Sequence, residues 1–351
     1  MFKRSSTSTR LSRRGSTVVV LVASCLVAGC RNQGAPAKPV VVIYTALDQI
    51  YSEPILKRFE ERTGVEVRAL YDAEAAKTTG LVNRLIARRK LPDCDVFWNN
   101  EIIQTVRLAQ MGLFEPYQSP QAQRIPAQFR DEHHRWTGFA ARLRVLIYNT
   151  RLVSNADRPR SVKDLIDPRW RGRTGVARPF FGTTLTHMVW LDQHWGADAF
   201  ASFCRSLKQN EVALTSGNAA VRDLVAAGEL AFGLTDTDDA HGAMLDGKPV
   251  AVAIPDRDGG VVLIPNTVAL VANCPHPVQG RKLIDFLLSA DVERALASTR
   301  GAQIPLGTDL ADLATPWDEL RNAPVLETDL QEAARSVERV IEILRAAGLD
   351  R

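Results

Sequence analysis

Leu230-Ala-Phe-Gly-Leu-Thr-Asp-Thr-Asp-Asp-Ala240 is the stretch around which this chain is organised. Its first half is a short apolar run of the kind that forms a buried strand. Three carboxylates follow directly, from Asp236, Asp238 and Asp239. In open α/β sheets, ligands bind in the crevice outside the carboxyl ends of the strands. A solvated turn also uses Asp and Thr, and on this stretch alone the turn is favoured; the rest of the chain favours a binding site.

The region before this stretch alternates between expected strands and helices. Strands are predicted at 40–44, 65–70 and 95–98, with amphipathic helices from about 52 to 63 and 81 to 86 between them. Ser52 is expected to cap the first helix. This β-α-β-α-β order is typical of a parallel sheet with helices on its faces. Asp48 follows the first strand, and Asn100 and Glu101 follow the third, so these polar residues should lie at one edge of the sheet.

The second half of the chain carries two further groups of interest. Arg142 and Arg144 lie two residues apart on a strand-like run from 140 to 149, so they project from one face. Gly182-Thr183-Thr184 precedes an expected helix at 185–194, and such a helix start offers N–H and hydroxyl groups to an anion. The remaining pattern predicts strands at 174–177, 250–254, 261–264 and 267–271, and helices at 197–208, 219–227, 278–288 and about 330–344.

The N-terminus has the pattern of an export signal. Residues 1–29 contain five Lys or Arg and no acid, and the apolar run Val18 to Ala28 is too short to span a bilayer as a helix. It ends in Leu26-Val-Ala-Gly-Cys30, which resembles the lipobox of bacterial lipoproteins. The pattern predicts a lipoprotein signal peptide at 1–29, acylation of Cys30 and a tether at 30–39. A cleaved signal without lipid is the alternative.

Charge and cysteine content give no indication of nucleic-acid binding or of a zinc site. Removing the five positive charges of residues 1–29 from the net charge of +4 leaves −1, so nothing in the charge suggests nucleic-acid binding. Three cysteines remain after Cys30, namely Cys94, Cys204 and Cys274, without CxxC spacing. At most one disulfide can form, buried free thiols are equally expected, and no zinc site is indicated.

A set of motifs then runs in order from about Val40 to Leu306. It includes Tyr44-Thr-Ala-Leu-Asp48, Phe59-Glu-Glu-Arg-Thr-Gly-Val-Glu-Val67, Asp95-Val-Phe-Trp98, Asp167-Pro-Arg-Trp-Arg-Gly-Arg173 and Leu283-Ile-Asp-Phe-Leu-Leu-Ser289. In this set the chain resembles the ferric-ion-binding branch of the extracellular solute-binding proteins of ABC importers. The resemblance implies a type II periplasmic-binding-protein fold, in which two α/β lobes close on a ligand between them. It places lobe 1 at 40–142 plus 267–315, lobe 2 at 143–266 plus 316–351, and hinge strands near 142–146 and 262–270.

The iron ligands of that family do not carry over. By the resemblance, Asp48 stands at its histidine position, Asn100 at its glutamate position beside Glu101, and Asp238 and Asp239 at its two adjacent tyrosines. Hard carboxylate oxygens suit Mg²⁺, Ca²⁺ or Mn²⁺ and do not exclude ferric iron. The expected metal ligands are therefore Asp48, Asp238 and Asp239.

The anion-contacting positions of the family survive in part. Arg142, Gly182, Thr183 and Asn218 match them, Thr184 follows Thr183 directly, and Asp236 joins the candidate ligand residues two positions before Asp238. Such a set suits a ferric or divalent metal ion with a companion anion, or an organic ligand that carries an amine and a phosphate or carboxylate. Arg144 is either a further contact or a structural residue paired within the hinge.

The sequence therefore predicts an exported, lipid-anchored, monomeric periplasmic protein that delivers a small ionic ligand to an ABC permease in the inner membrane. It should perform no chemistry and require no cofactor. One alternative is an exported metal-dependent hydrolase, although the sequence has no HExxH or GxSxG motif and no histidine directly beside the aspartates. A sensory ligand-binding module is the other alternative.

Overall fold

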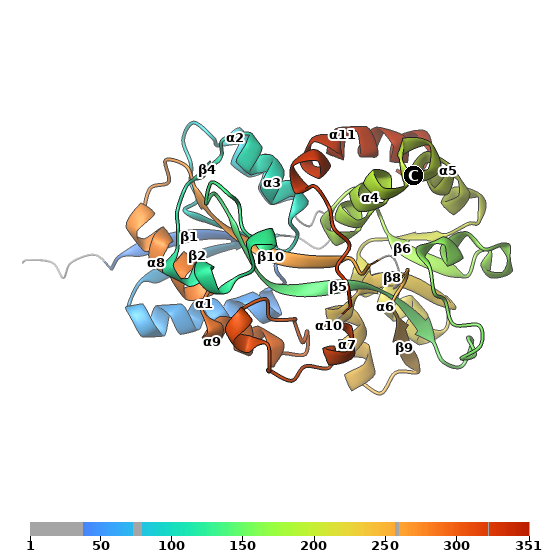
Figure 1. Ribbon diagram of the computed structural model, residues 1–351. Helices are drawn as coiled ribbons and strands as arrows, with labels where there is room; N and C mark the ends of the chain where they lie inside the picture. The colour runs from blue at the N-terminus through green and yellow to red at the C-terminus, as the bar shows by residue number, and fades with distance from the viewer. Residues whose placement is uncertain (1–37, 73–78, 257–259, 322, 351) are drawn as a thin grey trace, which may run out of the picture. The chain divides into compact units, whose positions relative to one another are not determined.

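The computed structural model describes residues 38–72, 79–256, 260–321 and 323–350 (Figure 1). The predicted signal peptide, Cys30 and the tether up to residue 37 lie outside these ranges. Within them, no helix combines the length and the apolar character that a membrane crossing requires.

One long strand, β5 (Thr137–Asn149), takes part in two sheets. Its first half pairs with β10 (Leu263–Val271), and its second half pairs with β8 (Phe232–Asp236) and β9 (Val250–Ala253). The strand order is β2-β1-β3-β10-β5-β8-β6-β7, with β4 beside β10. The other strands are β1 (Val40–Thr45), β2 (Glu66–Tyr71), β3 (Val96–Asn99), β4 (Phe114–Glu115), β6 (Thr174–Ala177) and β7 (Ala213–Thr215). We call the part that contains β1 to β4 the first sheet and the part that contains β6 to β9 the second sheet.

Helices cover the strands on two sides (Figure 1). In this view α2, α3, α4 and α11 lie above the strands, and α1, α7 and α9 lie below them. The α-helices are α1 (Gln49–Thr63), α2 (Thr79–Ala87), α3 (Ile103–Gln110), α4 (Gly182–Trp195), α5 (Ala197–Gln209), α6 (Asn218–Ala227), α7 (Thr237–Leu245), α8 (Pro277–Leu287), α9 (Ala290–Ala297), α10 (Asp318–Arg321) and α11 (Leu330–Ala346). Short 3₁₀ helices are η2 (Pro120–Arg124), η3 (Ala127–Phe129), η4 (Val162–Ile166), η5 (Pro168–Trp170) and η7 (Thr308–Leu310).

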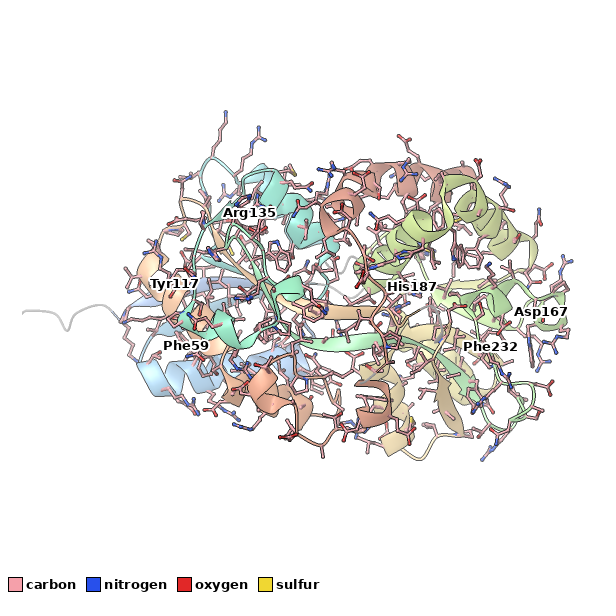
Figure 2. The ribbon with its side chains drawn as sticks, viewed as in Figure 1. Phe59, Tyr117, Arg135, Asp167, His187 and Phe232 are labelled. Atoms are coloured by element: carbon pink, nitrogen blue, oxygen red, sulfur yellow. The ribbon has the colours of Figure 1, made fainter. Side chains whose placement is uncertain are left out.

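Aromatic residues mark the apolar packing around each sheet. Beside the first sheet, Phe59 of α1 meets Phe286 of α8 with ring centroids 5.4 Å apart. Beside the second, Phe232 of β8 meets Trp170 edge-on at 5.5 Å. Figure 2 labels Phe59 toward the left of the view and Phe232 toward the right. Edge-to-face and tilted pairs of this kind stabilise a core beyond the area that they bury.

The parallel sheet predicted from the sequence is confirmed, because β1 pairs in parallel with both β2 and β3. The strands predicted as hinges correspond to β5 and β10. The expectation that Ser52 caps the first helix is wrong. Helix α1 begins at Gln49, and the Ser52 hydroxyl lies inside its first turn, where it donates to the carbonyls of Leu47 and Asp48.

The two strands predicted at 261–264 and 267–271 are one strand, β10, with a defect in its middle. Pro265 has no N–H to donate to a neighbouring strand, so a regular ladder cannot pass through it. A register shift between Pro265 and Asn266 accommodates it, and on the facing strand Ala140 adopts a φ of 41°. Arg142 and Arg144 follow this irregularity on β5.

Helix α6 approaches the second sheet closely because two neighbouring strands carry glycine. A Cβ on Gly233 would lie 2.4 Å from Cγ1 of Val221 and 2.7 Å from the carbonyl oxygen of Gly175. Any side chain at residue 233 would therefore push α6 away from β8. This packing brings the first residue of α6, Asn218, to the end of β8.

Candidate functional site

Strand ends and helix starts border one small cavity. It has a volume of about 30 Å³, close to the share of one molecule in liquid water. Every predicted ligand residue except Glu101 lines it. The lining residues are Asp48, Asn100, Arg142, Ala177, Phe181, Gly182, Thr183, Thr184, Gly217, Asn218, Asp236, Asp238 and Asp239.

Three of the aspartates form a compact group. One carboxylate oxygen from each of Asp236, Asp238 and Asp239 lies within 4.8 Å of the others. They are not part of a loose turn, because α7 begins at Thr237 and places Asp238 and Asp239 in its first turn. The partial positive charge of a helix N-terminus stabilises carboxylates there. A hard cation would find several oxygen ligands at this point.

Arg142 borders the same cavity and is almost fully buried. Its Nη1 lies 3.6 Å from Oδ2 of Asp238, and its Nη2 donates to the carbonyl of Asn100. Burial alone would lower the pKa of Arg142, but the surrounding carboxylates, Asp238 foremost, raise it above the usual value. The Nε atom of Arg142 has no hydrogen-bond partner in the described part of the chain.

Arg144 pairs with Asp236, which agrees with the expectation that it is a structural residue held in an ion pair. The two residues face each other across β5 and β8, and Nη1 of Arg144 donates to Oδ1 of Asp236 over 2.6 Å. The arginine also donates to the hydroxyls of Thr183 at 3.1 Å and Thr184 at 3.3 Å. The sequence reasoning grouped these threonines with Arg142. Because β5 pairs with β8, the two threonines accept hydrogen bonds from Arg144 instead.

The second carboxylate oxygen of Asp236 is also occupied. Oδ2 accepts a hydrogen bond of 2.7 Å from the Thr183 hydroxyl and one of 2.9 Å from the Asn218 amide. Burial would raise the pKa of Asp236, but Arg144 and Arg142 outweigh it and hold the pKa below its usual value. Asp236 is therefore a buried, ionised carboxylate.

Glu101 does not line the cavity, although the sequence placed it among the ligand residues. Its Oε2 accepts from the Thr186 hydroxyl at 2.7 Å and from the backbone N–H of Ile103 at 2.8 Å. Its Oε1 accepts from the Asn99 side chain at 2.8 Å. Burial raises the pKa of Glu101, and these hydrogen bonds only partly oppose it. In this arrangement Glu101 caps the start of α3 and links it to α4.

The sequence reasoning missed two residues near the aspartates. Tyr51 lies on α1, and burial together with Asp238, Asp239 and Asp48 raises its pKa to about 12. The spacing of three residues from Asp48 was the available signal, because it puts both on one side of the helix start. His187 accepts from Nε of Arg144 at 3.5 Å, and burial lowers its pKa to about 3.

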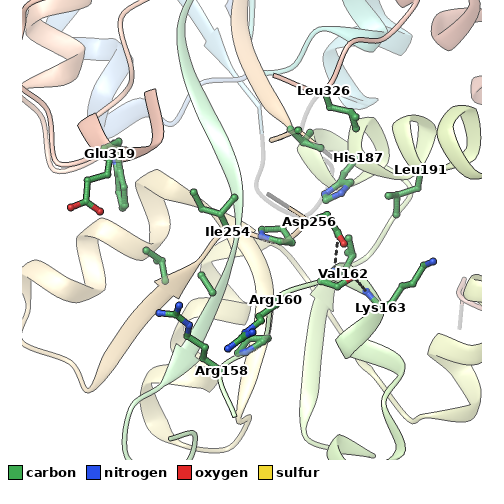
Figure 3. Close-up of a pocket in the computed structure, with 18 of the residues that line it drawn as sticks. Arg158, Arg160, Val162, Lys163, His187, Leu191, Ile254, Asp256, Glu319 and Leu326 are labelled. Atoms are coloured by element: carbon green, nitrogen blue, oxygen red, sulfur yellow. Dashed lines mark hydrogen bonds between the residues drawn. The ribbon is translucent and has the colours of Figure 1, made fainter. Parts of the chain in front are cut away.

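A larger cavity of about 1190 Å³ lies elsewhere, between η4, α4 and β9 (Figure 3). Arg160, Val162, His187 and Ile254 are among its lining residues, and Asp256 accepts from the backbone N–H of Val162 at 3.0 Å. None of the predicted ligand residues lines it.

The three cysteines and the final helix lie away from the small cavity. Cys94, Cys204 and Cys274 are buried free thiols, and burial raises the pKa of Cys204 and Cys274 to about 12. The final helix, α11, packs on α3, α4 and α5, and within the described residues it contributes nothing to the lining of the small cavity.

A family model of bacterial extracellular solute-binding proteins matches residues 94–328. The chain belongs to this family. A relative of this solute-binding protein is the Fe(3+)-binding periplasmic protein of Serratia marcescens, 25% identical over 94% of this chain and 97% of its own. Another is the putative 2-aminoethylphosphonate-binding periplasmic protein of Salmonella typhimurium, 26% identical over 81% of this chain and 82% of its own.

Solved structures agree with this membership. The crystal structure of iron-bound HitA from Pseudomonas aeruginosa matches with a TM-score of 0.78 at 21% identity, covering 88% of this chain and 99% of the other. The predicted periplasmic-binding-protein fold is thereby confirmed. Members of the family bind solutes and are not enzymes, which excludes the alternative of an exported hydrolase.

Proposed function

We propose that this solute-binding protein carries a metal cation to an ABC permease in the inner membrane and holds it with Asp48, Asp238 and Asp239. The observation behind the proposal is the small cavity bordered by carboxylates. Its 30 Å³ are far below the roughly 300–1,000 Å³ of pockets for drug-sized ligands. A bare ion fits this space, whereas an organic ligand requires the walls to move apart.

The relatives support a metal cargo, since the Serratia marcescens protein is named for ferric ion and HitA was crystallised with iron. Here the two tyrosine positions of the ferric-binding branch hold Asp238 and Asp239. An all-oxygen ligand set accepts ferric iron and equally Mg²⁺, Ca²⁺ or Mn²⁺. The choice among these ions is the first point to measure.

In the proposed mechanism two lobes, with the boundaries predicted from the sequence, close over the ion. Strands β5 and β10 connect the lobes and act as the hinge. We further propose that the protein is a periplasmic monomer, anchored through lipid on Cys30. A sensory protein would use the same site, and a permease gene or a histidine-kinase gene beside this one would distinguish the two roles.

A thermal-shift experiment tests the cargo. Mn²⁺, Ca²⁺, Mg²⁺ and Fe³⁺ are added separately, and a cation that binds only the folded protein stabilises it by about 2.7 kcal/mol at a hundred times its Kd. The double substitution Asp238→Ala with Asp239→Ala should abolish the shift and leave the fold intact. Asp198→Ala is the matched control, because Asp198 is an exposed acid in the first turn of α5. A full shift in the double variant would remove the two aspartates from the site.

A second candidate is an organic ion that carries an amine and a phosphonate or phosphate. Both α4 and α6 begin at the cavity without a side-chain cap, which leaves N–H groups suited to an anion. The Nε of Arg142 is a further donor without a partner among the described residues, and the Salmonella typhimurium relative is named for 2-aminoethylphosphonate. A thermal shift with 2-aminoethylphosphonate and none with any cation would select this candidate.

A further inference from the structure

We propose that Asp236 acts as a built-in anion, so that the protein binds its cation without a companion anion from solution. The inference rests on the proposed function, because it concerns how a cation is held. It goes further by assigning the donor groups of the second sheet to a partner within the chain.

Three side chains that would help to hold an external anion converge on the Asp236 carboxylate, while Nε of Arg142 has no hydrogen-bond partner among the described residues. Arg144, Thr183 and Asn218 donate to it over 2.6, 2.7 and 2.9 Å. A carboxylate presents two oxygens with about four acceptor sites in one plane, as formate does, and carbonate is planar with a third oxygen. Asp236 thus supplies the chemical group that a companion anion would otherwise bring.

Counting hydrogens shows how little donor capacity remains on the side chains of Thr183, Thr184 and Asn218. The Thr183 hydroxyl has one hydrogen, and it is used by Asp236. The Asn218 amide has two, which go to Asp236 at 2.9 Å and to the oxygen of Thr183 at 2.9 Å. The Thr184 hydroxyl donates to the Asn218 carbonyl oxygen at 3.4 Å. An external anion would have to break this network before any of these side chains could bind it.

Burial makes such an exchange costly. Arg144 is 1% exposed and Asp236 is 3% exposed, and separating a buried ion pair leaves a charge without compensation. An added anion would also bring a second negative charge beside Asp236. The carboxylates of Asp48, Asp238 and Asp239 at the same cavity favour a cation and repel a further anion.

The first test uses the full-length wild-type chain. Mg²⁺, Ca²⁺, Mn²⁺ and Fe³⁺ are titrated calorimetrically in carbonate-free buffer, then again with millimolar formate, bicarbonate or phosphate in separate experiments, after correction for metal–anion complexes in solution. We expect the Kd to change by less than about threefold. A cation that binds about tenfold more tightly with an anion, or only with one, would overturn the inference but leave the cation cargo in place. Binding of none of the four cations under any condition would overturn the proposed function and, with it, the inference, whereas anion-dependent binding would overturn the inference alone.

The second test removes the built-in anion. In Asp236→Ala the donors of Arg144, Thr183 and Asn218 are released, so millimolar formate or phosphate should raise its melting temperature and restore cation binding. Wild type and the Asp198→Ala control should show no such shift with these anions. A folded Asp236→Ala protein that ignores both anions would overturn the inference. If this variant does not fold even with formate, the wild-type titrations decide.

Discussion

Arg142 and Arg144 show how much of the site depends on single residues. They lie on one face of β5, as their spacing predicted, yet Arg142 faces Asp238 and the carbonyl of Asn100 while Arg144 faces Asp236. The difference arises from strand register, since Arg144 stands directly opposite Asp236 on β8. Cross-strand partners of this kind cannot be read from one sequence, because the register between distant strands is not local information.

His187 gives a prediction at this scale. Its pKa is lowered to about 3 by burial and by Arg144, whereas in the unfolded chain it is about 6.5. Between these values the unfolded state binds the additional proton, so the free energy of unfolding falls as the pH falls, by at most about 1.4 kcal/mol per pH unit. His187→Asn keeps an acceptor for Arg144 and removes this contribution.

Urea denaturation of both proteins between pH 7 and pH 4 measures the effect. The stability lost on acidification should be smaller in His187→Asn than in wild type. An NMR titration that places the native pKa of His187 near 6.5 would contradict the prediction.

At the scale of elements, the packing of α6 on the second sheet decides where Asn218 lies. The approach depends on the two glycines, Gly175 and Gly233, and on Val221. Gly233→Ala should therefore destabilise the protein by about 1–3 kcal/mol through overpacking. It should also weaken ligand binding, because α6 carries Asn218 to the cavity.

Gly242 in α7 offers a matched control. A Cβ there would meet nothing within 4 Å, so Gly242→Ala should stabilise the helix by up to about 1 kcal/mol. Both variants are compared by urea denaturation. Equal stability of Gly233→Ala and wild type would show that α6 moves freely over the strands.

Element boundaries also show what sequence patterns capture. The polar residues after β1 and β3 were predicted to lie at one edge of a parallel sheet, and Asp48 and Asn100 do line one cavity, together with Asp238 after β8. The residue pattern alone divided β10 into two strands, whereas the family resemblance gave one hinge strand near 262–270. Pro265 is tolerated within it through a register shift that depends on the facing strand. The position of Glu101 outside the lining of this cavity was not foreseen for a related reason, since its partner Thr186 lies on a helix that is distant in the sequence.

At the scale of the molecule, the parts that carry the two sheets are joined by more than strands. Glu101, at the start of α3, accepts from Thr186 of α4. Helix α11 adds two ion pairs. Glu338 of α11 pairs with Arg107 of α3, and Arg339 of α11 pairs with Asp192 of α4 over 2.6 Å. If the lobes separate on opening, the buried Glu101–Thr186 hydrogen bond has to break.

Thr186→Val tests this link. The variant leaves a buried carboxylate short of one hydrogen bond, which should lower the free energy of unfolding by about 1–3 kcal/mol near neutral pH. It should also weaken ligand binding, because a conformation that is less populated lowers the apparent affinity in proportion.

Thr63→Val is the control. Thr63 is exposed and donates to the carbonyl of Phe59 within α1, so its loss should change stability by no more than about 0.5 kcal/mol. Thr186→Val with unchanged stability and affinity would show that the hydrogen bond to Glu101 does not hold the two parts together.

The shared strand β5 also limits how the gene can vary. Side chains alternate along a strand, so inserting or deleting one codon between Arg142 and Arg144 would turn one arginine away from the site. The same change would shift the register of β5 against β8 or β10, because both pair with it. Evolutionary change in this segment is therefore limited to substitutions. A new ligand preference can arise here only when one side chain replaces another in a strand of unchanged length.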